Sequence, residues 1–379
     1  MTDKQTVKFG DICREVKLTT KDPIADGYER YIGLEHLDSG SLKIKRWGMI
    51  EEDNPSFTRV FKKGNLLIGK RRPYLKKAGI AEFDGICSGD IIVVESKKSK
   101  LEKGLLPFIV QSQEFWEWAV KTSSGSLSPR TKFKSLSEFE IKEVSPESQA
   151  RLLHSLLSVE KSIGLMDDVL EQAYTLKRIL ITKFFAKSFV SRFEHKEVYL
   201  RDVVEIQSGQ VDPMEKTYCD LPHIAPDNMT KVTGKLIEYR TAKEDGVTSG
   251  KYYFDDSWIL YSKIRPNLRK LCFPRFSGVC SADVYPIKGR QGLLTEYLFY
   301  LLQSEHFNRY AISTSTRSGF PKINRDDLGA YRFYLPEEKA QVLAISKLIE
   351  VDKTIESCLS YLSRPAEIKS SMISSEVGL

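Results

Sequence analysis

The chain has 379 residues, a hydrophobic content of 41%, a charged content of 29% and a formal net charge of +7. This length predicts two or three domains, and the composition is that of an ordinary soluble globular protein. No apolar run approaches the roughly 18–20 residues of a membrane span, and the polar, charged beginning is typical of neither a signal peptide nor an anchor. The six cysteines and five histidines are scattered without metal-ligand spacing, so we expect no metal site and reduced cysteines in a cytoplasmic protein.

The charge surplus lies in two long blocks, with +5 for residues 1–145 and +3 for residues 191–335. These blocks contain an internal repeat. Residues 61–90 and 254–283 are identical at 12 of 30 positions at a constant offset of 193, where chance would give about two. Residues 106–115 match 298–307 at an offset of 192. The chain is therefore a duplicated unit.

Each copy contains short β-rich runs separated by turn clusters, together with helical patterns that are best seen at 105–122 and 294–313. The runs NLLIG and DIIVVES in the first copy and WILYS, KEVYL and DVYPI in the second predict strands. We therefore expect an α+β fold with two pseudo-symmetric globular domains. The order of the strands does not follow from the sequence.

A long helical pattern follows Pro146 in the first copy and Pro336 in the second. Its apolar residues step by four and three, which is the seam of a coiled coil. Each seam holds a lysine at the same position, and Pro365 should kink or end the second helix. Each helix could pack on its own domain, but the shared register and length of about 60 Å favour two helices packed on each other as an antiparallel coiled coil. The first seam comprises Leu152, Leu156, Val159, Ile163, Met166, Leu170, Ala173, Leu180 and Phe184, and the second comprises Ala344, Leu348, Val351, Ile355, Cys358 and Leu362.

The strongest local signal is a basic segment that recurs in both copies, KRRPYLKK at 70–77 and KIRPNLRK at 263–270. Pro73 and Pro266 should stop the preceding strand and force a turn that presents the cations. Lys and Arg on a rigid turn suit neutralisation of phosphates, and Arg can also read guanine in the major groove. A solvated loop is the alternative. The candidate DNA-binding residues of the turns are Lys70, Arg71, Arg72, Lys76, Lys77, Lys263, Arg265, Arg269 and Lys270.

A second candidate is the loop rich in Ser, Thr and Gly that follows the helical pattern of each copy, at 122–136 and 314–328. Hydroxyls, backbone N–H groups and cations in one loop form a natural phosphate-binding set. A plain helix-to-strand connection explains the loop equally well. The candidate residues are Ser124, Arg130 and Lys132 in the first copy and Arg317, Lys322 and Arg325 in the second.

Two enzyme-like patterns are weak. Residues 54–57 (NPSF) are near the tetrapeptide of adenine N6-methyltransferases but lack its second proline, and no glycine-rich cofactor loop follows a strand. Asp90 with Glu95 and Lys97 fits the spacing of metal-dependent nucleases, whereas the second copy has Lys288 and Arg290 at the corresponding places. We therefore expect no catalytic centre in this chain.

Residues 124–153 and 316–345 share an ending with a glycine-containing loop, a short step that closes on Leu136 or Leu328, a strand, a proline and the start of the long helix. Together with the duplication, this ending resembles the specificity subunits of type I restriction–modification enzymes over essentially the whole chain. Those proteins usually have Glu-Gln after the proline, whereas this chain has Ser148-Gln149 and Glu338-Lys339.

The resemblance implies target recognition domains at 1–145 and 191–335, each of which reads one half of a bipartite DNA target. It implies helical spacers at 146–190 and 336–379 that fix the separation of the half-sites and dock two methylation subunits, which recruit restriction subunits. S-adenosylmethionine and ATP would belong to those partners. A specificity subunit of another, type II-like methyltransferase or nuclease, or a non-enzymatic RNA-binding or tethering protein, are the alternatives.

Overall fold

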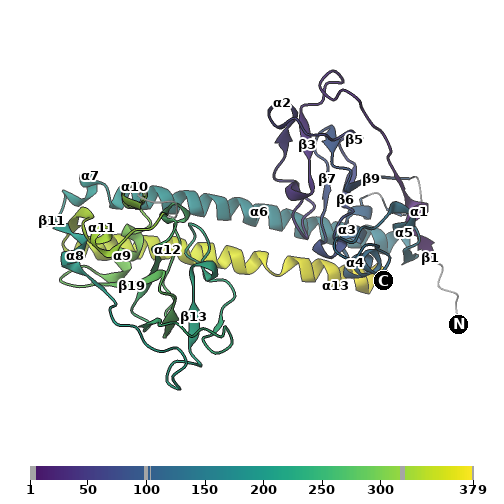
Figure 1. Ribbon diagram of the computed structural model, residues 1–379. Coiled ribbons are helices and arrows are strands. Elements are labelled where there is room, and N and C mark those ends of the chain that lie inside the picture. Colours follow the sequence, from purple (N-terminus) through teal and green to yellow (C-terminus); the bar gives the residue numbers. More distant parts are fainter. Residues whose placement is uncertain (1–5, 98–100, 103, 316–320, 378–379) are drawn as a thin grey trace. The chain divides into compact units, whose positions relative to one another are not determined.

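The computed structural model describes residues 6–97, 101–102, 104–315 and 321–377. The chain divides into two compact units (Figure 1). The first comprises Met1–Asp168 and Leu359–Leu379, and the second comprises Val169–Cys358. A long helix therefore begins in the first unit and ends in the second, and a later helical segment returns to the first.

The first unit holds two four-stranded sheets, with strand orders β2-β9-β6-β7 and β4-β3-β8-β5, and a two-stranded sheet of β1 and β10. All neighbours are antiparallel except β3 and β8, which are parallel. The strands are β1 (Thr6–Lys8), β2 (Cys13–Glu15), β3 (Arg30–Ile32), β4 (Gly48–Met49), β5 (Arg59–Phe61), β6 (Leu66–Gly69), β7 (Ala78–Ile80), β8 (Gly85–Cys87), β9 (Ile91–Ser96) and β10 (Glu140–Lys142). The short helices are α1 (Phe9–Ile12), α2 (Ile50–Asp53), α3 (Leu106–Gln111), α4 (Gln113–Lys121) and α5 (Phe133–Leu136), with 3-10 turns η1 (Leu34–His36) and η2 (Pro73–Leu75).

The second unit repeats this topology strand for strand, with orders β12-β19-β16-β17, β14-β13-β18-β15 and β11-β20. Its strands are β11 (His195–Tyr199), β12 (Val204–Ile206), β13 (Pro222–Ile224), β14 (Arg240–Thr241), β15 (Tyr252–Phe254), β16 (Ile259–Ser262), β17 (Leu271–Cys272), β18 (Gly278–Cys280), β19 (Val284–Gly289) and β20 (Arg332–Pro336). Its helices are α7 (Lys187–Val190), α8 (Leu200–Val203), α9 (Thr295–Leu301), α10 (Glu305–Ser315) and α11 (Arg325–Gly329), with η3 (Pro226–Asn228) and η4 (Pro266–Leu268). The α+β fold and its duplication are confirmed.

Strands β6 and β9 are buried on both faces, which explains their continuous apolar sequences. Side chains alternate between the faces of a strand. Leu66 and Ile68 pack with α3 and α4, whereas Leu67 packs with residues of the other sheet. The sheet β2-β9-β6-β7 therefore lies between α3 and α4 on one side and the sheet β4-β3-β8-β5 on the other. The second unit has the same alternation at Ile259, Leu260 and Tyr261 of β16.

The long helices are α6 (Pro146–Phe184), α12 (Glu338–Leu362) and α13 (Pro365–Val377). Pro146 is the first residue of α6, and α12 ends three residues before Pro365, as the sequence predicted. Among the described residues, no helix is long and apolar enough to cross a membrane.

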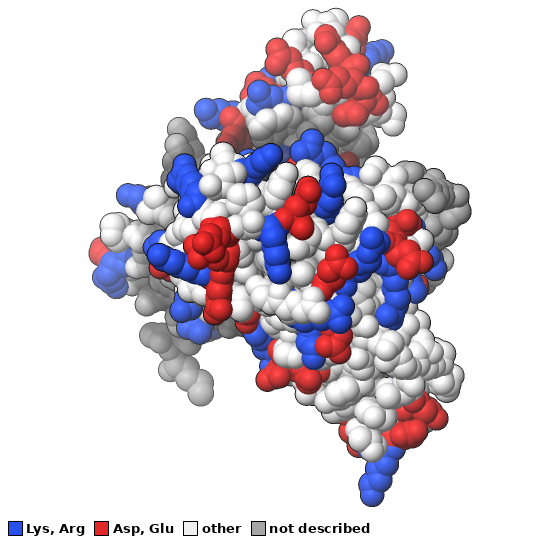
Figure 2. Space-filling view, turned by 90° about the vertical axis from the view of Figure 1, so that its left-hand side faces the viewer, with Lys and Arg blue, Asp and Glu red and all other residues white. Residues whose placement is uncertain are grey.

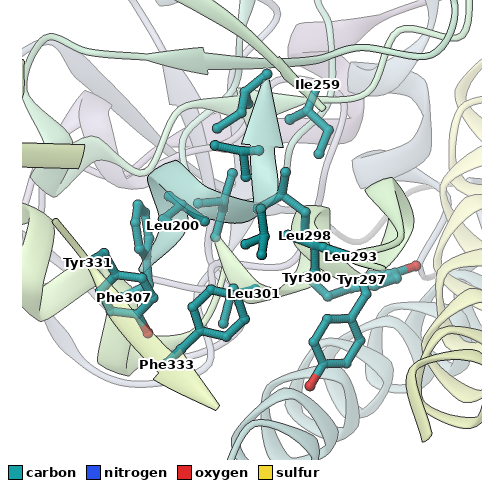
Figure 3. Packing of buried hydrophobic residues seen from close by; sticks show 14 of the residues in the cluster. Leu200, Ile259, Leu293, Tyr297, Leu298, Tyr300, Leu301, Phe307, Tyr331 and Phe333 are labelled. Carbon is teal, nitrogen blue, oxygen red and sulfur yellow. The ribbon is translucent and has the colours of Figure 1, made fainter. Parts of the chain in front are cut away.

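The ends of the long helices belong to the cores of the globular parts. In the second unit, Ile181 and Phe184 of α6 and Ala344 and Leu348 of α12 share one core with aromatic side chains of α9 and β20. Figure 3 shows Tyr297, Tyr300 and Phe333 of that core. In the first unit, Leu152 and Leu156 of α6 and Ile373 of α13 join the core beneath α3 and α4. The long helices thus pack on the globular parts, which was the alternative interpretation, and α6 does so in both units.

The helices also pack on each other within each unit, antiparallel as predicted. Lys177 of α6 pairs with Asp352 of α12 at 2.8 Å in the second unit, and Lys369 of α13 pairs with Glu160 of α6 in the first. Of the predicted seam, Val351, Ile355 and Cys358 are buried, whereas Val159, Ile163, Met166, Leu170 and Leu362 are half-buried.

Candidate nucleic-acid interface

The two basic segments form turns with the same backbone conformation. The first begins where β6 ends and contains η2, and the second begins where β16 ends and contains η4, each of which starts at the proline. Arg72 and Lys76 have φ of 55° and 49°, and Arg265 and Arg269 have φ of 47° and 50°. Residues other than glycine rarely adopt this left-handed region, and such residues persist only where the surroundings hold them. Both copies therefore present their basic side chains from the same constrained scaffold.

The described end of the Ser- and Gly-rich loop in each copy, at 129–130 and 321–322, packs directly against the turn. The Arg72 N–H donates to the carbonyl of Pro129 at 2.7 Å, and the Arg265 N–H donates to the carbonyl of Pro321 at 2.8 Å. Arg130 forms an isolated antiparallel bridge with Arg71, as Lys322 does with Ile264. The two segments that the sequence indicated separately thus form one surface in each unit.

One aspartate in each copy anchors this surface. Asp90 accepts from the Arg130 Nε–H at 2.9 Å and lies 3.9 Å from Arg71 Nη1. This carboxylate raises the pKa of the Arg130 guanidinium, chiefly through the hydrogen bond. Its counterpart Asp283 lies 3.6 Å from Lys263 Nζ and 3.5 Å from Lys322 Nζ. One negative charge faces at least two positive charges in each copy, so both clusters remain cationic.

The sequence did not identify Asp90 as a residue of this surface. The nuclease-like spacing had drawn attention to it, but its carboxylate is engaged by arginines. Among the described residues, His, Cys, Asp and Glu form no group of three that could hold a metal ion. The signal for its actual role is that Asp90 and Asp283 both close the most similar part of the repeat.

Four of the predicted cations hold the turns in place. Lys77 and Lys270 each donate from Nζ at 2.7 Å to a carbonyl at the start of a 3-10 turn, that of Leu34 and that of Pro226 respectively. The Lys270 side chain is only 13% exposed. Lys76 donates to Gln113, and Arg269 donates to the corresponding Glu305 at 2.6 Å. These residues have a structural contact that the sequence could not distinguish from a DNA-facing role.

The remaining candidates differ in exposure. Ser124 and Lys132 are exposed. Arg325 is half-buried and donates to the carbonyls of Ile206 and Gln207 at 3.3 and 2.5 Å, so it links α11 to the end of β12. Arg317 lies outside the described residues.

We define the first basic surface as Lys70, Arg71, Arg72, Arg130 and Lys132, and the second as Lys263, Arg265 and Lys322. Arg72 and Arg265 are exposed at the centre of each turn, and Arg71, Arg130 and Lys322 are about half exposed. Cations on a rigid turn can neutralise phosphates and position side chains against base edges.

The end of the second unit formed by α7, α8 and β11 has a different character. Figure 2 shows Lys and Arg side chains interleaved there with Asp and Glu. Arg332, for example, lies 3.3 Å from Glu197 on the β11–β20 sheet. Such a mixed face provides no continuous positive potential for a polyanion.

An aromatic pair with one exposed ring recurs in both copies. Trp47 packs against Phe83 with ring centroids 5.5 Å apart, and Tyr239 packs against Phe276 at 5.4 Å. Phe83 and Phe276 are identical positions of the repeat, whereas Trp47 and Tyr239 lie in the stretches 45–59 and 238–253, which diverge, so the sequence did not indicate this correspondence.

Comparison with known proteins identifies a matching family and a relative for part of the chain. Residues 194–360 match the family described as type I restriction modification DNA specificity domain. The specificity subunit of the type I restriction enzyme EcoDI from Escherichia coli is 35% identical over 183 residues. This region is 45% of the present chain and 40% of the relative, so the match spans less than half of either protein.

Solved structures extend the similarity of fold to nearly the whole chain. A type I restriction–modification S subunit from M. genitalium has a TM-score of 0.57 at 12% identity and covers 98% of this chain and 96% of its own. A chain from a study of complex assembly and conformational transition of the type I system has a TM-score of 0.55 at 16% identity and covers 98% and 97%. At these identities the comparison establishes the fold.

Proposed function

We propose that the whole chain is the DNA specificity subunit of a type I restriction–modification complex, because residues 194–360 match the family described as type I restriction modification DNA specificity domain and residues 1–145 repeat their topology. Each globular part reads one half of a bipartite, asymmetric duplex target. The chain itself performs no chemistry.

The observation that carries this proposal is the pair of basic surfaces with one backbone geometry on two domains of one topology. Phosphate contacts supply affinity that is independent of sequence, and base contacts supply specificity. Two linked readers convert two weak contacts into one tight event through effective concentration. Because the frames match while segments such as 45–59 and 238–253 diverge, the two readers recognise different half-sites.

The helices supply the contacts with partners. Exposed apolar side chains on α6 include Val169 and Leu176, and the corresponding exposed residues after one repeat are Tyr361 and Ile368. Exposed apolar residues in equivalent places fit two equivalent docking surfaces. We propose that each binds one methylation subunit, that restriction subunits join through those subunits, and that S-adenosylmethionine and ATP are bound by the partners.

Competition binding tests the function directly. The full chain, alone and with its methylation subunits, is incubated with a labelled genomic duplex pool and with single-stranded DNA or RNA as competitor. Sequencing of methylated sites in the host identifies the target. We expect duplex DNA to compete best and bound fragments to share one bipartite sequence. Preferential competition by RNA would refute the proposal, and a continuous target would favour another class of methyltransferase or nuclease.

A further inference from the structure

Leu127 is an apolar side chain placed at the tip of a polar loop. It is 93% exposed, and no other large hydrophobic residue in the described part of the chain is as exposed. Its neighbours in the sequence are Ser126 and Ser128, so no adjacent apolar side chain covers it. A leucine in this position gains nothing for the fold, because burial of its side chain is what would stabilise it.

The loop that carries Leu127 is held firmly. Ser124 and Arg130 exchange backbone hydrogen bonds of 3.0 and 2.9 Å that close the loop. Arg71 Nε donates to Ser128 Oγ at 2.6 Å, one residue from Leu127. Gly125 adopts φ of +111°, which L side chains rarely take. The tip therefore has a defined position beside the first basic surface.

The shape and surroundings of the loop fit the major groove of duplex DNA. The bridges of Arg130 with Ser124 and with Arg71 make a short antiparallel ribbon, and the major groove admits a two-stranded ribbon. Arg71, Arg72 and Arg130 lie at its base, where they can contact phosphates. In the major groove the apolar group on the base edges is the thymine methyl.

We propose that Leu127 is a specificity-determining residue that contacts a thymine methyl group in the half-site read by the first unit. This rests on the proposed function as a DNA reader. A protein partner fits the loop less well, because Arg71 and Arg130 at its base give this surface a positive charge that suits a polyanion.

The test removes the methyl group from the DNA and the side chain from the protein. Each thymine of both half-sites is replaced in turn by uracil, and affinity is measured for the wild-type chain in its complex and for Leu127→Ala. We expect one position at which uracil weakens wild-type binding about three- to fivefold, the effect of burying one methyl group. Leu127→Ala should bind the thymine duplex correspondingly less tightly and should be insensitive to uracil there.

Leu18→Ala is the matched control, because Leu18 is also exposed, at 47%, but lies outside this loop. Both variants should keep the wild-type melting temperature. If the wild type shows no sequence preference, the proposed function fails. If it binds its target specifically but uracil has no effect, if the first half-site has no A·T pair, or if Leu127→Ala retains the full uracil effect, this inference is wrong. Loss of a methylation subunit with unchanged DNA affinity would also overturn it.

Discussion

Lys177 and Asp352 form an ion pair of 2.8 Å in the second unit, and the same carboxylate accepts a hydrogen bond from the Tyr300 hydroxyl at 2.8 Å. Lys369 and Glu160 form the equivalent pair in the first unit, where Lys369 also donates to Gln111 at 2.9 Å. Each lysine interrupts an otherwise apolar seam at the same place in the repeat. The two pairs share one antiparallel register, because Lys177 precedes Lys369 by the same number of residues as Glu160 precedes Asp352.

Removal of the lysine charge should destabilise the helix pair. Lys177 is 12% exposed, so Lys177→Met leaves Asp352 without its cation in a partly buried place. We expect the free energy of unfolding to fall by about 1–3 kcal/mol, measured by denaturant titration. Lys347→Met is the control, because its pair with Glu350 is exposed and should contribute under about 1 kcal/mol. Equal losses in both variants would contradict a structural role for the seam pair.

Loss of Arg72 or Arg265 should weaken DNA binding without unfolding the chain, because both side chains are exposed. If the arginine reads a base, Arg→Ala should cost about 1–3 kcal/mol and relax one target position. If it contacts a phosphate, the salt slope should shrink by about one. Arg332→Ala removes the same charge from the mixed face near Glu197 and should leave affinity unchanged. Unaltered binding by both turn variants at moderate salt would exclude the turns from the interface.

Lengthening both helices in register should lengthen the DNA spacer. Seven residues inserted after Asp168 and after Ser360 enter at facing positions between the two ion pairs, so both pairs keep their register. The added length is about 10 Å, or about three base pairs. We expect methylation-site sequencing to show unchanged half-sites with a longer spacer. The same insertion in α6 alone should disrupt DNA binding. An unchanged DNA spacer in the double insertion would refute the proposal that the helices fix the separation of the half-sites.

Equivalent docking surfaces predict two methylation subunits per chain. Native mass spectrometry should show a 2:1 complex for the wild type. Val169→Glu and Tyr361→Glu each place a charge on one exposed apolar site and should each reduce the complex to 1:1, with no binding in the double variant. The free chain should still bind DNA. Saturation of the wild type at 1:1 would contradict the proposal.

Thiol accessibility should distinguish one cysteine from the other five. Cys219 is half-buried, whereas Cys13, Cys87, Cys272, Cys280 and Cys358 are buried. Burial raises the pKa of the Cys13 and Cys87 thiols to about 12, so the reactive thiolate is scarce at pH 8. A thiol reagent should therefore modify one site rapidly and the rest on unfolding. Cys219→Ser should abolish the rapid phase of modification. Rapid modification of several cysteines in the wild type would contradict the burial of the other five.

The sequence predicted what depends on local pattern. Pro146 begins α6, and the runs NLLIG and DIIVVES became β6 and β9. The expected helix at 105–122 is instead divided, because the Ser112 hydroxyl accepts from the Phe115 N–H at 3.2 Å and starts a new helix. Ser304 does the same with Phe307 in the second copy. This capping serine, repeated at the same place, could have been recognised.

Long-range pairing and exposure could not be predicted. The parallel pairing of β3 with β8 joins strands more than fifty residues apart, and no local pattern encodes it. Lys77 and Lys270 recur in the repeat for a structural reason, since both hold a 3-10 turn. Recurrence alone therefore identifies a constrained place and leaves open whether the side chain faces DNA or the protein.

The pairing of β1 with β10 and of β11 with β20 has a consequence for how such a protein diversifies. In each half the first and last strands are hydrogen-bonded neighbours, with Val7 opposite Ile141 and Val198 opposite Phe333. The chain therefore enters and leaves each globular part at neighbouring strands, and a long helix follows the last strand directly. Insertions, deletions or wholesale exchange of the intervening residues leave that junction where it is. Each half can evolve as an interchangeable module while the helical framework stays constant.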